Sequence, residues 1–159
     1  MSDVMNSRLM WVMAAVLVVA IGAAVGYKLK LQQAQTVIAQ AELDSGCDLH
    51  QRACSLTIPG GGKVTFGISP QPIPVIEQLQ LTVETEALDA KAITVDFAGV
   101  DMNMGVNRFS LKRKEAGVYH GNGILPVCVR NRMSWEAKVM VQTDEGVIIA
   151  PYRFDTSNR

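Results

Sequence analysis

The sequence predicts an all-β protein, an immunoglobulin-like antiparallel β-sandwich preceded by one N-terminal transmembrane helix. Three observations carry this prediction. About seven short segments with alternating apolar and polar residues follow residue 47 at spacings of about 8–12 residues, as in sandwich proteins. Trp135 falls on the apolar side of a late segment, where a buried tryptophan suits a sandwich core. An uncharged apolar run near the amino terminus predicts the helix.

The length and the net charge of the chain limit the functions it can have. Its 159 residues have room for one domain plus an anchor. Lys plus Arg equals Asp plus Glu, at 15 each, so the formal net charge is zero. A neutral chain lacks the basic footprint of nucleic-acid-binding proteins, and we therefore expect no nucleic-acid partner.

The apolar run covers residues 9–27 (LMWVMAAVLVVAIGAAVGY) and is long enough for the roughly 30 Å hydrocarbon core of a bilayer. Trp11 and Tyr27 sit near its ends, where amphipathic rings favour the membrane interface. We predict a membrane anchor over residues 1–30. Two alternatives stay open: a buried core helix, and a signal peptide cleaved near residues 24–26, although the apolar cores of signal peptides run only about 7–15 residues.

The segment after the apolar run has a helix-forming composition without Gly or Pro through residue 43. We expect it to continue the helix as a short stalk that ends at residues 44–46. This places a stalk or linker over residues 31–46 and a β-sandwich domain over residues 47–159.

The cysteines indicate the compartment. Cys47 and Cys54 bracket a short polar loop (DLHQRA), and pairing them is the default because they are close in sequence. The spacing lacks the CxxC and histidine partners of a zinc site. Persistent disulfides belong to oxidising compartments, which places the domain outside the cytoplasm. In a Gram-negative bacterium this predicts a single-pass protein of the cell inner membrane, with its soluble domain in the periplasm.

The strands follow in order. Residues 55–58 and 63–69 predict a hairpin around the glycine-rich turn at 59–62. The prolines of residues 70–74 exclude a central strand. The later predicted strands are residues 77–87, 92–100, 109–112, 117–125, 133–143 and 147–154. A basic loop is expected at residues 113–116 and a hairpin turn at residues 144–146.

The chain carries no nucleophile elbow, no phosphate-cradling glycine loop and no HExxH motif. We therefore expect no catalytic residues and no enzyme activity.

The residue types that stand out are soft metal donors. Thioether, thiolate and imidazole groups select cuprous copper over harder ions. The candidate ligands, all between residues 95 and 141, are Met102, Met104, His120, Cys128 and Met133.

Met102 and Met104 are two residues apart, so their side chains should project to the same side of an extended turn. Each candidate also has an ordinary structural explanation. Methionine fills gaps in cores, a free cysteine such as Cys128 is commonly a small buried hydrophobe, and His120 alone suits a surface strand.

Residues 77–154 resemble the FixH/YtkA-like group of small membrane-anchored periplasmic β-sandwich proteins. The shared features, beside the single anchor, are Met102-x-Met104-Gly105, Gly117-x-Tyr119, Leu125-Pro126, Met133-Ser134-Trp135-Glu136 and Val139-x-Val141. The resemblance implies copper as cofactor and a role in copper handling, with a haem-copper oxidase or its assembly factors as partners. The chain departs from the pattern in having no histidine-rich metal segment and in having Cys128 where a methionine is expected.

Two hypotheses follow. The first is a membrane-tethered module that binds or passes cuprous ion. The resemblance implies that such a module aids the assembly of a haem-copper oxidase. The second is a metal-free, membrane-anchored assembly or interaction module whose methionines contact a partner, since methionine-rich patches serve adaptable protein surfaces.

Overall fold

The computed structural model describes residues 2–33, 36–126 and 131–157, which fall into two separate units, Met1–Thr36 and Val37–Arg159. The first unit is one helix, α1 (Ser2–Gln33). Its segment Met10–Lys28 has a mean hydropathy of 2.2 and is long and apolar enough to cross a membrane. By length and composition it fits a membrane anchor or a signal sequence.

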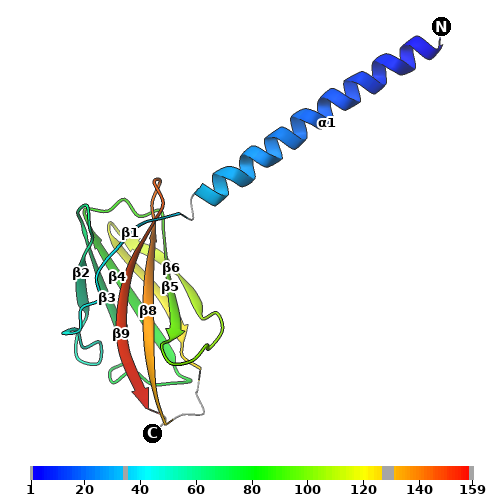
Figure 1. The fold of residues 1–159 in the computed structure, drawn as a ribbon. Coiled ribbons are helices and arrows are strands. Elements are labelled where there is room, and N and C mark those ends of the chain that lie inside the picture. The colour runs from blue at the N-terminus through cyan, green and yellow to red at the C-terminus, as the bar shows by residue number, and fades with distance from the viewer. Residues whose placement is uncertain (1, 34–35, 127–130, 158–159) are drawn as a thin grey trace. The chain divides into compact units, whose positions relative to one another are not determined.

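The second unit is all β, which confirms the predicted fold class (Figure 1). Its strands are β1 (Val37–Gln40), β2 (Cys54–Thr57), β3 (Lys63–Ser69), β4 (Gln78–Glu86), β5 (Ala92–Gly99), β6 (Arg108–Glu115), β7 (Val118–Ile124), β8 (Arg132–Gln142) and β9 (Val147–Ser157). They form a single curled sheet in the order β1-β9-β8-β5-β6-β7-β4-β3-β2.

The sheet closes into a sandwich-like shape because β6 belongs to both halves. The first part of β6 pairs with β5, as in Ile93 opposite Leu111, and its second part pairs with β7, as in Lys112 opposite His120. The inner residues of both halves then face each other across one core.

The core contains the predicted tryptophan. Trp135 is fully buried, and its indole Nε1–H donates to Thr156 Oγ1 at 2.9 Å. Aromatic rings link neighbouring elements around it, with Phe97 6.0 Å from Phe154 between ring centroids. The period-two pattern of the sequence therefore identified the buried side of the strands.

The predicted helical stalk is confirmed as far as Gln33 and wrong beyond it. The helix ends at Gln33, and Val37–Gln40 forms β1, which runs parallel to β9 instead of extending the helix. The backbone N–H of Ala41 donates to the Ile149 carbonyl at 2.8 Å, and Ala41 is buried. The β-branched residues Val37 and Ile38 suit a strand, and pairing with the edge of β9 decides the outcome over local helix propensity.

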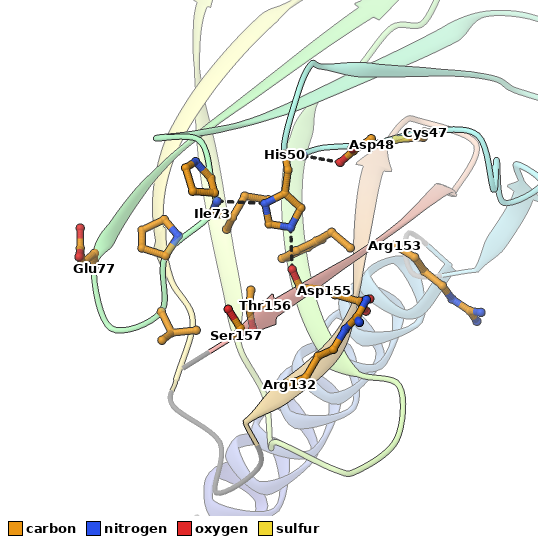
Figure 2. A pocket seen from close by; sticks show the side chains of 14 residues that line it. Cys47, Asp48, His50, Ile73, Glu77, Arg132, Arg153, Asp155, Thr156 and Ser157 are labelled. Atoms are coloured by element: carbon orange, nitrogen blue, oxygen red, sulfur yellow. Dashed lines mark hydrogen bonds and ion pairs between the residues drawn. The ribbon is translucent and has the colours of Figure 1, made fainter. Parts of the chain in front are cut away.

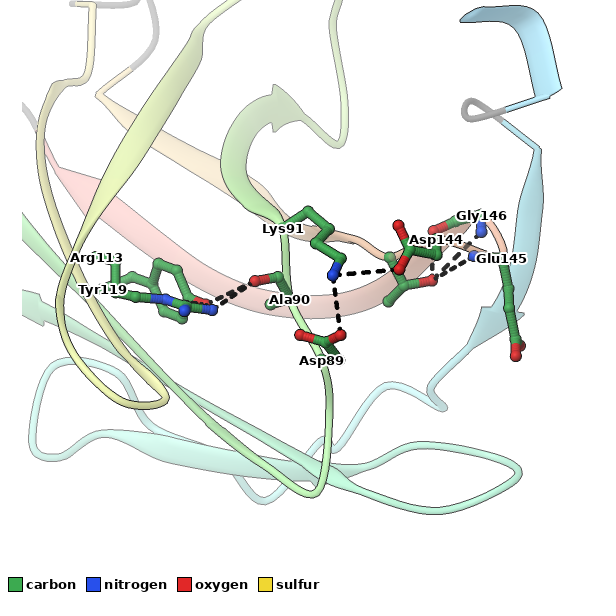
Figure 3. Close-up of polar contacts among 9 residues, drawn as sticks. Asp89, Ala90, Lys91, Arg113, Tyr119, Asp144, Glu145 and Gly146 are labelled. Carbon is green, nitrogen blue, oxygen red and sulfur yellow. Dashed lines mark hydrogen bonds and ion pairs between the residues drawn. The ribbon is translucent and has the colours of Figure 1, made fainter. Parts of the chain in front are cut away.

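The predicted basic loop is also wrong, because β6 continues through Glu115. Arg113 explains this: its Nε and Nη2 donate to Tyr119 Oη at 3.0 and 2.7 Å, and Nη2 also donates to the Ala90 carbonyl at 2.7 Å (Figure 3). The Tyr119 hydroxyl donates to the same carbonyl at 2.9 Å. A guanidinium held at three points keeps its backbone in the strand.

The predicted turns at residues 59–62 and 144–146 are confirmed, with Ile58 N–H bonded to the Gly62 carbonyl and Thr143 N–H to the Gly146 carbonyl. Beside the second turn, Lys91 Nζ lies 3.0 Å from Asp89 and 3.2 Å from Asp144 (Figure 3). These hydrogen bonds raise the pKa of Lys91. All three side chains are exposed, so the ion pairs contribute little to stability.

Candidate functional site

The loop between β5 and β6 carries two of the predicted metal ligands, Met102 and Met104. Its shape is held by local hydrogen bonds: Gly105 N–H donates to Asn103 Oδ1 at 2.8 Å, and Asn107 Nδ2 donates to the Met104 carbonyl at 3.1 Å. The Asn107 carbonyl in turn accepts from Phe97 N–H at 2.9 Å, which ties the loop to β5. The loop is therefore a defined turn built on asparagine side chains.

Both loop methionines are half-buried and pack against the core. Residues 98–105 line a cavity of about 350 Å³, and Met102 and Met104 are both on its wall. Met102 and Met104 thus border one open space.

Met133 is the third candidate that the structure brings to this place. It is the second residue of β8, it faces the core, and only 3% of its surface is exposed. A methyl group built on Gly99 would overlap the Met133 Cε atom and the Met102 carbonyl oxygen, and would come within 3.1 Å of Met104 Cγ. The loop and β8 therefore meet over Gly99.

His120 is not brought to the methionines. It lies exposed in β7, opposite Lys112 and Thr82, with its Nδ1 3.3 Å from Thr82 Oγ1. Leu111 of β6 lies opposite Ile93 of β5, and Lys112 is the next residue of β6. Gly99 lies six residues beyond Ile93 in β5. At about 3.3 Å per residue this separates the two places by about 20 Å along the strand.

Cys128 lies outside the described residues. Among residues 2–33, 36–126 and 131–157, no three His, Cys, Asp or Glu side chains gather as a metal-binding group. Of the candidates that the structure describes, Met102, Met104 and Met133 carry thioethers.

A second hollow, which the sequence did not reveal, lies beside the predicted disulfide. Cys47 and Cys54 are bonded, with their Cα atoms 5.8 Å apart, which confirms the pairing. The pocket measures about 930 Å³ and is lined by the disulfide loop, the proline segment and the end of β9 (Figure 2).

His50 connects these three segments. Its Nδ1 accepts the backbone N–H of Ile73 at 3.2 Å, and its Nε2 lies 2.6 Å from the carbonyl oxygen of Asp155 (Figure 2). Ile73 offers only a donor there, so Nδ1 must be the accepting nitrogen and the proton sits on Nε2. The imidazole is a structural cross-link, because both of its nitrogens are used.

The carboxylate of Asp155 is similarly held. It accepts hydrogen bonds from Ser134 Oγ at 2.6 Å and Arg132 Nη2 at 2.6 Å, and these, led by Ser134, lower its pKa. The polar groups at the centre of this pocket are thus paired with one another. These contacts hold the pocket wall together.

Comparison with protein-family models, curated proteins and solved structures finds no match for this chain.

One residue at the methionine site, Gly99, was not predicted from the sequence as a contributor. Gly99 did carry a signal. An isolated glycine inside an alternating strand often marks a place where another part of the chain approaches closely.

Proposed function

We propose that the protein is a membrane-anchored module that binds cuprous ion through Met102, Met104 and a further soft donor. One observation carries the proposal: Met102 and Met104 line one cavity, and Met104 and Met133 meet over Gly99. Thioethers are soft ligands and need no deprotonation, so this donor set suits cuprous copper and does not suit hard cations such as calcium or magnesium.

The setting of the domain supports an extracytoplasmic role. An apolar helix precedes it, and a disulfide closes its first loop. Disulfides persist in oxidising compartments, so we propose that α1 is retained as an inner-membrane anchor and that the sandwich lies in the periplasm. The resemblance to FixH/YtkA-like proteins suggests copper handling for a haem-copper oxidase or its assembly factors, without catalysis by this chain.

A second function, docking of a partner without metal, is favoured by the surface of the same loop. Val100 is 42% exposed and Val106 is 83% exposed, on either side of Met102 and Met104. Apolar side chains presented together with methionines suit a protein interface.

Cuprous ion affinity separates the two functions. The full chain in detergent micelles, with ascorbate to maintain cuprous ion, is titrated against a chromophoric chelator. The variant Met102→Leu/Met104→Leu keeps volume and apolarity, so its unfolding free energy should change by less than about 1.5 kcal/mol. Its copper affinity should fall at least about tenfold, or about 1.4 kcal/mol.

Met140→Leu is the matched control, because it removes a thioether from β8 at a distance from the loop. It should bind copper as the parent does. If the double variant also binds as the parent does, the methionines are packing or interface residues, and metal-free docking becomes the better function.

A further inference from the structure

Gly99 occupies the last position of β5, where an inward-facing side chain would normally extend the core. The residues two and four places before it, Phe97 and Val95, are fully buried on the inner face. Gly99 continues this series and pairs with Trp135 of β8. The sheet therefore has an empty inner position at the end where the methionine loop begins.

Side-chain atoms of Met133 and Met104 lie in the space that a side chain at residue 99 would take. A Cβ atom at residue 99 would overlap Met133 Cε and would lie 3.1 Å from Met104 Cγ. In methionine, Cε and Cγ are the two carbons bonded to the sulfur. The sulfur atoms of Met133 and Met104 are therefore each one bond from the atoms that meet over Gly99.

We propose that Met133 is the third donor of the cuprous site and that Gly99 is the residue that positions it. This inference rests on the proposed function and adds the identity of the third ligand. Of the other candidates, His120 is about 20 Å away along the strand direction, by the register of β5, β6 and β7.

The loop methionines and Met133 differ in their exposure to solvent. Met102 and Met104 border the open cavity of about 350 Å³, whereas Met133 is 3% exposed. Met133 is not among the residues that line this cavity, so as third donor it would act from the buried side of Gly99. A buried thioether excludes water from one side of the ion, which favours a dry, soft site over an exposed one.

Gly99→Ala tests the positioning. Its methyl group overlaps a backbone oxygen, that of Met102, as well as a side chain, so both the loop and Met133 must move. Gly67→Ala is the matched control in another strand. Its Cβ would meet only the Ala53 side chain and backbone, at 3.2 and 3.9 Å, and its strand, β3, is four strands from β5 in the sheet order. Met133→Leu tests the donor itself with volume conserved.

The experiment uses the full chain in detergent micelles loaded with cuprous ion. Affinity is measured by chelator competition, the number of copper–sulfur bonds by X-ray absorption, and folding by thermal unfolding. Met133→Leu should lose one copper–sulfur bond and at least tenfold in affinity. Gly99→Ala should lose a similar factor, and Gly67→Ala should bind as the parent does.

The outcomes are distinguishable. A parent that binds no cuprous ion overturns the proposed function itself. A parent that binds, with Met133→Leu retaining both the affinity and the sulfur count, overturns only the role of Met133. If Gly99→Ala does not fold, the Met133→Leu measurement decides; if it folds and binds as the parent does, Gly99 has no positioning role.

Discussion

Tyr152 offers the sharpest test of how the two halves of the sheet are joined. It belongs to β9, is 1% exposed, and donates its hydroxyl proton to the Val64 carbonyl of β3 at 2.7 Å. Its ring also packs against Phe66, with 5.3 Å between centroids. Tyr152→Phe removes this hydrogen bond between the facing halves and keeps the ring in place.

The expected loss follows from these contacts. A net hydrogen bond contributes about 0.5–1.5 kcal/mol, and a carbonyl has a second lone pair for the strand ladder, so we expect a loss of about 1 kcal/mol. For a domain of this size that corresponds to a decrease in Tm of about 4 °C.

The effect should depend on pH. Burial raises the pKa of the Tyr152 hydroxyl in the folded protein. The group therefore contributes its full stability below about pH 10, the ordinary value for tyrosine, and loses it as the pH rises further. Phenylalanine cannot ionise, so the difference between parent and variant should shrink above about pH 10.

Urea unfolding of the full chain in micelles, followed by near-ultraviolet circular dichroism at pH 7 and pH 10.5, measures both effects. Tyr27→Phe, at a side chain that is 68% exposed in α1, controls for loss of a hydroxyl alone. Equal stability of parent and Tyr152→Phe at pH 7 would refute the energetic role of the hydrogen bond. A difference that stays constant at pH 10.5 would refute the role of burial.

Two further predictions concern the second pocket. Replacing Cys47 and Cys54 with serine should lower the unfolding free energy by roughly 2–3 kcal/mol, since the bridge closes a short loop in the unfolded chain; urea unfolding measures this, and an unchanged midpoint would contradict it. Ser134→Ala should raise the pKa of Asp155, measured by NMR titration of its carboxyl carbon, because the Ser134 hydrogen bond lowers it. A carboxyl with a lowered pKa contributes stability above its ordinary pKa of about 3.9 and loses it as the pH falls, so the variant should lose less on acidification; an unchanged pKa would assign the shift to Arg132.

The alternation of apolar and polar residues in the sequence was sufficient to predict most strands of the sheet. In the segments that became β4, β5 and β8, every second residue is apolar, and those residues are the buried ones. Turn residues were equally informative at positions 59–62 and 144–146. Both signals are local, since side-chain direction alternates along any strand and glycine permits left-handed turns wherever they occur.

The sequence did not predict those segments whose conformation depends on contacts with residues far away in the chain. The segment Val37–Gln40 follows the helix without a Gly or Pro to end it, and it becomes a strand because it pairs with the edge of β9. Arg113 reads as part of a solvated turn, and it lies in a strand because Tyr119 and Ala90 accept its donors. Local propensity is weak compared with such tertiary contacts.

By itself, the sequence determined the apolar helix, the all-β class, the disulfide and the residue types that could bind a soft metal. Only the tertiary structure decided which of those residues meet. Met104 and Met133 are far apart in the chain and come together because β5 and β8 are neighbours and Gly99 leaves room between them. His120 is closer to Met104 in sequence, and the sheet register carries it away along the strand. Spacing along a chain gives side-chain direction, whereas proximity across a sheet depends on strand order and register.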